Sequence, residues 1–285
     1  MKKVVPFFVI GLLFLRCTPS ETQPEKLFDL PKKLKEISGI TSVDNSIWAI
    51  ADSGNKNVLF QLTEAGDIAN EITIANAENI DWEDLASDTE GNIYIGDFGN
   101  NDNIRKDLYI YKISKDSLDT EETDAVAKIS FSYPEQKDFP PKKLELLYDA
   151  EAFIVYNNHF YIFTKNRSKN FDGTTLLYRV PMTAGNHQAT LMGSYKTDDT
   201  FNSGAVTGAA ISPNQKRIAI LSHQKVWLFE DFKEDAFFDG KISEINLNHN
   251  SQKEAIAFKN GNTLFIADEK VKKSGGIVYQ FDLNP

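Results

Sequence analysis

The sequence predicts an all-β protein with the β-propeller fold, and three observations carry this prediction. Short runs of strand-forming residues alternate with Gly, Asn and Asp turns along the chain. Phenylalanine and tyrosine are frequent, with 20 and 10 residues, whereas cysteine and methionine are scarce. A two-strand pattern recurs five times in nearly the same register, which a β-sandwich would not explain.

Each repeat is a hairpin that starts on a polar residue, passes through a turn and ends on a second polar residue. The five hairpins span residues 38–52, 83–97, 151–164, 207–222 and 254–268. The first and last polar residues are therefore 14, 14, 13, 15 and 14 positions apart. An aromatic-rich third strand follows each hairpin, and a more polar fourth strand usually comes next. Four strands per repeat are the blade of a propeller.

The remaining strands follow from the same pattern. Third strands are predicted over Val58–Leu62, Leu108–Ile113, Leu176–Val180, Val226–Glu230 and Ile277–Leu283. Fourth strands are predicted over Ile68–Ile74, Ala125–Tyr133, Ala189–Tyr195 and Lys241–Leu247. The fifth repeat lacks a fourth strand, and Glu25–Leu30 can supply it and so close the ring. A sixth blade within Glu121–Leu147 is the alternative, although the prolines from Pro134 to Pro141 favour a loop there.

The first residues are typical of an exported protein. Met1-Lys2-Lys3 precedes an apolar run from Val4 to Leu15, which is shorter than the roughly 20 residues of a membrane-spanning helix. The segment Phe14-Leu15-Arg16-Cys17 resembles the lipobox of bacterial lipoproteins, in which the cysteine is lipidated. An uncleaved anchor and a plain signal peptide are the alternatives.

These features divide the chain into a signal peptide over residues 1–17, a tether over 18–26 and a propeller over 27–285. We expect an extracytoplasmic lipoprotein, anchored to a lipid bilayer through acylation of Cys17, at the outer membrane or the cell surface. Removal of residues 1–16 leaves 28 Lys and Arg against 41 Asp and Glu, a net charge of −13. Such an acidic protein is a poor partner for nucleic acid or for anionic lipid headgroups.

The polar residues that begin and end the hairpins are the candidate site. The first strand of each blade lines the channel and the second is its antiparallel neighbour, so we expect these residues to meet at one mouth of the channel. Six of them are carboxylates: Asp52, Glu83, Asp97, Glu151, Glu254 and Asp268. A ring of like charges is unfavourable, and a Ca²⁺ ion, which prefers oxygen ligands, would relieve it.

A metal site is one of two interpretations of these carboxylates. Asp52-Ser53-Gly54-Asn55 and Asp97-Phe98-Gly99-Asn100 share the pattern Asp-x-Gly-Asn, which is also an ordinary turn sequence. The acids can therefore be turn and capping residues instead.

Basic residues near the same mouth predict an anion-binding function. Arg105, Lys165 and Arg167 follow the ends of the second and third hairpins and can bind a phosphate or a carboxylate. The alternative is that they form salt bridges with neighbouring acids. The histidines form no zinc-binding motif, and we expect His159 and His223 to lie on the surface near hairpin turns.

Several motifs resemble those of extracytoplasmic β-propellers, often lipoproteins, of the phytase-like and SdiA-regulated kind. They are Asp81-Trp82-Glu83-Asp84, Ile95-Gly96-Asp97-Phe98-Gly99-Asn100-Asn101, Asp149-Ala150-Glu151-Ala152 and Glu254-Ala255-Ile256-Ala257. The resemblance covers most of residues 27–285. It implies a site like that of the phytase branch, which hydrolyses phosphomonoesters with calcium ions at a carboxylate-lined channel mouth. The residues that would match its ligands are Glu83, Asp97, Glu151 and Glu254.

Two functions remain open from the sequence. The first is a tethered binding or interaction platform for a small anionic ligand or a protein partner. The second is a calcium-dependent hydrolase of a phosphoester or lactone, in which the cation would polarise the substrate and activate water. Convergence of the carboxylates on one point with an open coordination position would favour the hydrolase.

Overall fold

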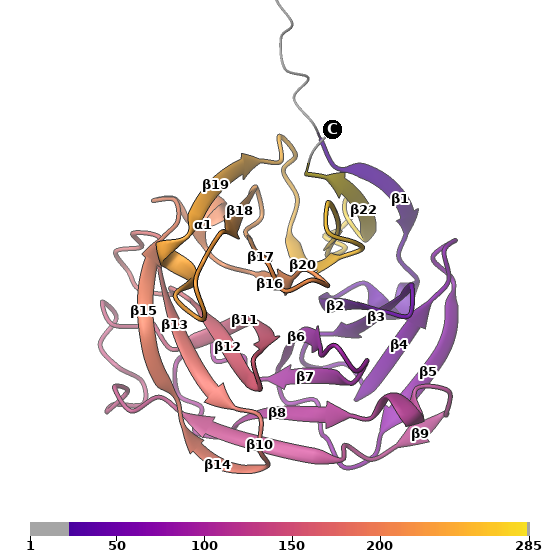
Figure 1. Cartoon of the computed structure of the whole chain (residues 1–285), viewed down its shortest axis with the longest axis horizontal. Coiled ribbons are helices and arrows are strands. Elements are labelled where there is room, and N and C mark those ends of the chain that lie inside the picture. The colour runs from indigo at the N-terminus through magenta and orange to yellow at the C-terminus, as the bar shows by residue number, and fades with distance from the viewer. Residues whose placement is uncertain (1–22, 284–285) are drawn as a thin grey trace, which may run out of the picture.

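Five β-sheets stand around a central channel in the computed structural model, which describes residues 23–283 (Figure 1). In each sheet one strand lies beside the channel and the others follow outward. The predicted all-β propeller is therefore confirmed, with five blades of four strands each. The alternative of a sixth blade within 121–147 is wrong for this chain, because that segment contributes strands to the first two blades and then a loop.

The strands of each blade are given from the channel outward. Blade 1 consists of β2 (Ile37–Val43), β3 (Ser46–Ala51), β4 (Val58–Leu62) and β5 (Ile68–Ile74). Blade 2 consists of β6 (Trp82–Ser87), β7 (Ile93–Asp97), β8 (Leu108–Ile113) and β10 (Ala127–Ser132). Blade 3 consists of β11 (Asp149–Tyr156), β12 (His159–Lys165), β13 (Thr174–Pro181) and β15 (Thr190–Lys196).

Blades 4 and 5 complete the ring. Blade 4 consists of β16 (Gly208–Ile211), β17 (Arg217–Leu221), β18 (Lys225–Glu230) and β19 (Lys241–Asn246). Blade 5 consists of β20 (Lys253–Phe258), β21 (Thr263–Asp268), β22 (Ile277–Asp282) and β1 (Glu25–Asp29). The connections contain short helical turns: η1 (Lys32–Leu34), η2 (Lys115–Ser117), α1 (Phe201–Gly204) and η3 (Phe237–Asp239).

The ring closes through the N-terminal strand, as predicted. Strand β1 pairs antiparallel with β22 and becomes the outer strand of the last blade. It begins at Glu25, inside the segment expected to be a tether. Its buried residue Phe28 packs in the cluster between blades 5 and 1, and Gly66 of blade 1 lies so close to the Phe28 ring that a Cβ there would overlap it.

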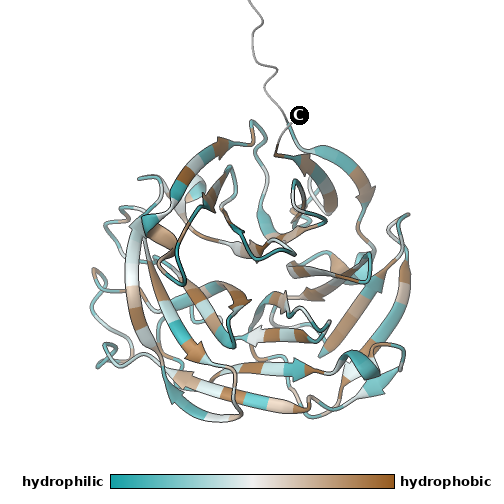
Figure 2. Cartoon of the chain, viewed as in Figure 1, coloured by the Kyte–Doolittle hydropathy of each residue, from teal (hydrophilic) through white to brown (hydrophobic). Residues whose placement is uncertain are grey.

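The core lies between the blades, with one apolar cluster at each of the five interfaces. Strand β7 shows how a single strand serves two of them. Ile93 and Ile95 pack between blades 1 and 2, whereas Tyr94 packs between blades 2 and 3, because successive side chains point to opposite faces. The second strands of the blades, buried on both faces, read as nearly continuous apolar runs, and hydrophilic residues gather in the loops and outer strands (Figure 2).

Two outer sheet edges are covered by segments from the next blade. Strand β9 (Glu122–Thr123), from the connection within blade 2, pairs parallel with β5 of blade 1. Strand β14 (Gly185–Gln188), from the connection within blade 3, pairs parallel with β10 of blade 2. These additions occupy edges that would otherwise present unpaired backbone groups, and they tie neighbouring blades together.

The predicted signal peptide over 1–17 and its lipidated Cys17 lie outside the described residues. Within residues 23–283, no helix has the length and apolar character needed to cross a membrane.

Candidate metal and ligand site at one channel mouth

Four of the five inner strands carry a β-bulge at the first polar position of the repeat. The register shifts between Trp82 and Asp84 in β6, and equivalent shifts occur in β2, β11 and β20. The bulged residues are Ser38, Glu83, Glu151 and Glu254. A bulge re-aims a side chain at the end of a strand. The inner strands all run the same way, so these four side chains belong to one mouth of the channel.

The hydroxyl residues at this position tie neighbouring blades together. Ser38 Oγ donates to the backbone oxygen of Trp82 at 2.7 Å, and Thr207 Oγ1 donates to that of Lys253 at 2.7 Å. Each acceptor is the residue directly before the bulged glutamate of the neighbouring blade. The Ser38 hydroxyl therefore holds the backbone next to Glu83, and the Thr207 hydroxyl holds the backbone next to Glu254.

Three acidic side chains of blades 1 and 2 converge at the mouth. One carboxylate oxygen from each of Asp52, Asp81 and Glu83 lies within 4.8 Å of the other two. We call these three residues the carboxylate cluster. The Glu83 side chain is almost fully buried, with the residue 7% exposed, and it accepts no hydrogen bond from any described residue. Asp52 and Asp81 are half-buried.

The cluster is electrostatically unfavourable when all three groups are ionised. The pKa of Asp52 is raised to about 6, chiefly by burial and also by the nearby Asp81 and Glu151, against a backbone hydrogen bond from Ser53. Burial also raises the pKa of Asp81, and it raises the pKa of Glu83 well above its ordinary value, with Glu151 and Asp52 adding to the latter effect. Such a cluster takes up protons or a cation.

A glycine backbone forms one wall of the cluster. A Cβ on Gly99 would overlap Oε1 of Glu83 and Oδ2 of Asp81, so only glycine lets the two carboxylates lie where they do. The Gly99 amide donates to the backbone oxygen of Asp81 at 3.2 Å. Arg105 holds this loop by donating to the Gly99 carbonyl at 2.8 Å and to Asp97 at 3.0 Å.

Acidic and basic side chains alternate across the other blades of the mouth. We call this series the charged chain, and its members in order are Asp149, Arg167, Glu151, Lys165, Glu254 and His223. Arg167 bridges Asp149 at 2.6 Å and Glu151 at 2.5 Å. Lys165 Nζ lies 3.0 Å from Glu151 and 4.0 Å from Glu254. His223 Nε2 lies 3.0 Å from Glu254.

The charged chain shifts the pKa values of its members in opposite directions. Burial alone would lower the pKa of Lys165, but Glu151 and Glu254 outweigh burial and raise it. Burial raises the pKa of Asp149 to about 7, with Glu151 adding to the effect and Arg167 opposing it. For Glu254, Lys165 and His223 outweigh burial and lower the pKa. Lys165 is therefore held as a cation by the two glutamates, whereas burial opposes the ionisation of Asp149 despite its ion pair with Arg167.

Two of the predicted ligands, Asp97 and Asp268, do not belong to the carboxylate cluster and accept hydrogen bonds from other groups. Asp268 accepts hydrogen bonds from Ile277 N and Tyr279 Oη, both at 2.9 Å, and Asp97 Oδ1 accepts from Arg105 and from Asp81 N. Their position ends the second strand, where Thr164 and Ser222 likewise accept from third-strand amides. Each bulge re-aims the first polar residue of its hairpin. Among the residues that end a hairpin, Asp52 joins the carboxylate cluster, whereas Asp97 and Asp268 make the hydrogen bonds given above.

The three predicted anion-binding residues are each paired with carboxylates. Lys165 and Arg167 belong to the charged chain, and Arg105 lies against Asp97 and Asp107. Of the three, Lys165 is the most buried, with only 5% of its side chain exposed. Their binding of an anion remains a prediction.

Sequence reasoning missed two residues at the mouth. His223 was expected on the surface, but its side chain is 16% exposed and pairs with Glu254. Burial raises the pKa of Glu269 to about 8, and Gln252 donates to its carboxylate at 2.6 Å. Both residues directly follow the last polar residue of their hairpins, as Lys165 does. That shared position was the signal that could have found them.

A buried aspartate closes the channel just beyond the mouth. Asp84 is fully buried and accepts hydrogen bonds from Leu85 N at 2.8 Å and from Phe153 N of blade 3 at 3.0 Å. The Ala209 amide of blade 4 adds a third. The other inner strands carry small residues at this level, namely Gly39, Ala152, Gly208 and Ala255. Small residues around a single carboxylate leave room for Asp84 at the channel axis.

Comparison with known proteins shows the fold alone. No protein-family model matches the sequence, and no curated protein matches it. Among solved structures, the PQQ-bound form of an aldose sugar dehydrogenase from Streptomyces coelicolor is similar, with a TM-score of 0.51 and 8% sequence identity. The match covers 93% of this chain and 99% of that one. At this identity the similarity concerns the propeller architecture.

Proposed function

We propose that this protein is a binding propeller whose ligand site is the charged mouth, and that Asp52, Asp81 and Glu83 hold a hard divalent cation there, with Ca²⁺ as the leading candidate. One observation carries the proposal: Glu83 is a buried carboxylate that accepts no hydrogen bond from a described residue and faces two further carboxylates. Burying an unpaired charge is costly. A cation with a preference for carboxylate oxygens relieves that cost.

The arrangement around the cluster favours an anionic ligand. The cluster offers three carboxylates from blades 1 and 2, and the cations Lys165 and Arg167 lie in the neighbouring blade 3. A phosphate or carboxylate ligand can contact a cation bound by the cluster. It can also replace one of the carboxylates that now pair with Lys165 or Arg167. A protein partner that presents such a group is equally compatible with this chemistry.

The cellular setting of the proposal rests on the sequence. We propose an extracytoplasmic protein tethered to a membrane through acylated Cys17, at the outer membrane or the cell surface. The mouth would then meet ligands outside the cytoplasm, where calcium is abundant enough to occupy a site of moderate affinity.

Hydrolysis of a phosphoester or lactone is the second candidate. It is favoured by side chains at the mouth of the kind that serve in general acid–base catalysis, namely Asp149, whose pKa burial raises to about 7, and the imidazole of His223 beside Glu254. The motifs that resemble phytase-like propellers support the same reading. Hydrolysis that stays unchanged when Glu83→Gln is combined with Glu151→Gln would rule out the mouth as its catalytic site.

The deciding experiment is a thermal melt of residues 18–285 in EDTA and in millimolar Ca²⁺. A cation at 100 times its Kd adds about 2.7 kcal/mol to the free energy of unfolding. We expect a clear rise in Tm that Glu83→Gln abolishes and that Glu64→Gln leaves intact, because Glu64 is an exposed acid with no part in the mouth. Equal melting with and without Ca²⁺ would refute the metal site and leave the acids as turn and capping residues.

A further inference from the structure

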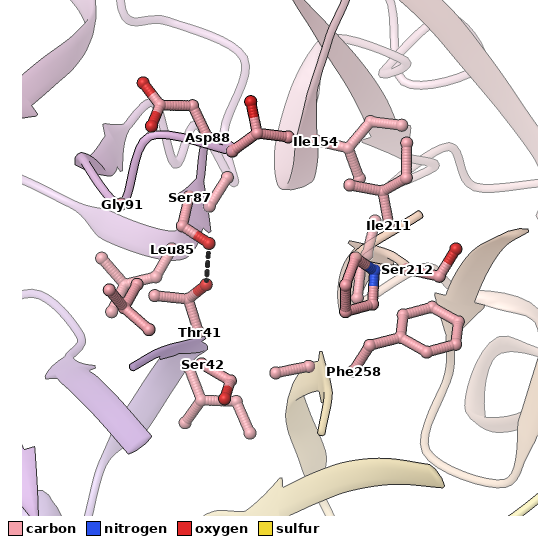
Figure 3. Close-up of a pocket in the computed structure, with 18 of the residues that line it drawn as sticks. Thr41, Ser42, Leu85, Ser87, Asp88, Gly91, Ile154, Ile211, Ser212 and Phe258 are labelled. Atoms are coloured by element: carbon pink, nitrogen blue, oxygen red, sulfur yellow. Dashed lines mark hydrogen bonds between the residues drawn. The ribbon is translucent and has the colours of Figure 1, made fainter. Parts of the chain in front are cut away.

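The opposite end of the channel opens into a second, separate pocket (Figure 3). Its volume is about 310 Å³, and the ends of all five inner strands line it together with the turns that follow them. Leu85, Phe153 and Ala209 contribute to its walls. The backbone amides of these three residues hold the Asp84 carboxylate, so Asp84 separates this pocket from the carboxylate cluster.

Hydroxyl side chains are concentrated on one side of the pocket, the polar arc, and apolar side chains on the other, the apolar arc, with Leu85 on the first side and Ser212 on the second as exceptions. Blades 1 and 2 supply the hydroxyl residues Thr41, Ser42 and Ser87, which lie on one side in Figure 3. Ile154, Ile211 and Phe258 of blades 3, 4 and 5 lie on the other side. A ligand with one polar edge and one apolar face matches this division.

The polar arc has hydrogen-bonding capacity to spare. Thr41 Oγ1 and Ser87 Oγ lie 3.0 Å apart and share one hydrogen bond, which uses only one of the two hydroxyl protons. Each inner strand also pairs with a neighbour on one side only, so its other edge carries backbone donors and acceptors toward the channel. Such groups need water or a ligand as partners. A ligand that replaces the water must therefore carry several donors and acceptors of its own.

The charges around the pocket favour a neutral ligand. No lysine or arginine lines it, and the acids that do are Asp44, Asp88 and Glu90 in the turns at its rim. The Asp88 carboxylate is already committed to Asn92 N and Tyr94 Oη, each at 2.9 Å. Asp44 and Glu90 are exposed acids that repel an anion.

We propose that this pocket binds a neutral polyol of about the size of a single sugar ring. Its hydroxyl groups would bond to Thr41, Ser87 and the free strand edges, and its C–H face would pack on Ile154, Ile211 and Phe258. The volume is at the lower end of the range for ligand pockets, about 300–1,000 Å³, which suits one ring. This site is independent of the cation proposed at the other mouth.

The test is an NMR titration of the isoleucine methyl groups in the whole propeller, residues 18–285. The probes are glucose and myo-inositol, with glucose 6-phosphate as their anionic counterpart. We expect saturable shifts at Ile154 and Ile211 with a neutral probe, weaker binding of the phosphate, and no shift at Ile72, which is buried in an outer strand. Absence of shifts at the pocket methyls with both neutral probes would overturn the proposal.

Two variants fix the location of binding. Ser87→Ala should raise the Kd about fivefold, as expected for the loss of one hydrogen bond. Ala210→Leu, which fills the pocket from the wall, should abolish binding, and a melt would establish that each variant folds. Glu83→Gln should leave polyol binding unchanged, which separates this proposal from the cation site. Equal affinity in Ser87→Ala and the wild type would place the polyol elsewhere and refute the assignment.

Discussion

The carboxylate of Asp84 accepts a hydrogen bond of 3.0 Å from the backbone amide of Phe153, on the inner strand of the neighbouring blade. Topologically this joins two inner strands that share no ladder hydrogen bonds. Asp84 lies between two unlike ends of the channel, the charged mouth and a pocket that no lysine or arginine lines. Asp84 is therefore a structural residue of the channel, although it lies next to the proposed ligand Glu83.

Asp84→Asn should destabilise the protein by about 1–3 kcal/mol, the usual cost of leaving a buried polar group unpaired. Both carboxylate oxygens face backbone donors, Leu85 N and Phe153 N. An asparagine would turn its NH₂ toward one of these donors. Urea unfolding measures the loss, with Asp119→Asn in an exposed turn as the control for the charge change. Unchanged stability of Asp84→Asn would show that the interblade bond has no energetic role.

Without a cation, the carboxylate cluster should make stability fall as pH rises from about 4, where free carboxyl groups titrate, through about 6. The pKa of Asp52 is raised to about 6 and that of Glu83 is raised further above its ordinary value. In this window the folded state binds more protons than the unfolded state, so the free energy of unfolding decreases with pH. Melts in EDTA across this range measure the slope.

Calcium should flatten that slope, because it binds the ionised cluster and displaces its protons. The rise in Tm on adding Ca²⁺ is therefore expected to be larger near about pH 8 than near about pH 5. Glu83→Gln should melt higher than the wild type in EDTA at the higher pH, since the amide removes one repelling charge. A Ca²⁺ effect that is equal at both pH values would contradict the proposed ligands.

Gly99→Ala should weaken cation binding about tenfold or more, in line with changes to residues that orient metal ligands. The added Cβ would push away the Glu83 and Asp81 carboxylates, whose flexible ends can move without unfolding the protein. Gly261→Ala is the matched control, because a Cβ there meets open space. Calorimetric titration with Ca²⁺ measures both. Wild-type affinity in Gly99→Ala would show that the cation, if bound, does not sit at this cradle.

The sequence predicted the fold well because each repeat can be recognised from residue types that lie close together along the chain. Turns, alternating strands and aromatic third strands recur, and even the closing strand over Glu25–Leu30 follows from the missing fourth strand. The candidate site was predicted only in part. A bulge is a register shift between two paired strands, and its position cannot be predicted from the type of any single residue. Glu83 and Asp268 therefore looked equivalent, although one faces the mouth and the other bonds to Ile277 and Tyr279.

The other features of the site that could not be predicted are contacts between residues far apart in the sequence. The pairing of His223 with Glu254 joins side chains 31 positions apart, and the close approach of the Gly99 backbone to the Asp81 and Glu83 carboxylates depends on how two separate segments of the chain meet. Such relationships are set by blade packing. Residues that take part in such contacts can be identified only when equivalent hairpin positions are compared across all five repeats.

Phe28→Ala should cost about 3 kcal/mol or more of unfolding free energy, the usual range for a phenylalanine lost from a core. Phe28 is the one buried residue of β1, and it packs among residues of blades 5 and 1, beneath Gly66. Its loss weakens the contact that closes the ring. Leu27→Ala is the control on the same strand, because Leu27 is 42% exposed and should change stability by less than about 0.5 kcal/mol.

Urea unfolding gives both values, and size-exclusion chromatography gives a second readout. If β1 detaches in Phe28→Ala, the edge of β22 is uncovered and the protein should self-associate, since a free strand edge pairs with other chains. Leu27→Ala should remain as the wild type in both measurements. Equal stability of the two variants would mean that the ring is held closed by its inner strands alone, and that β1 only covers an edge.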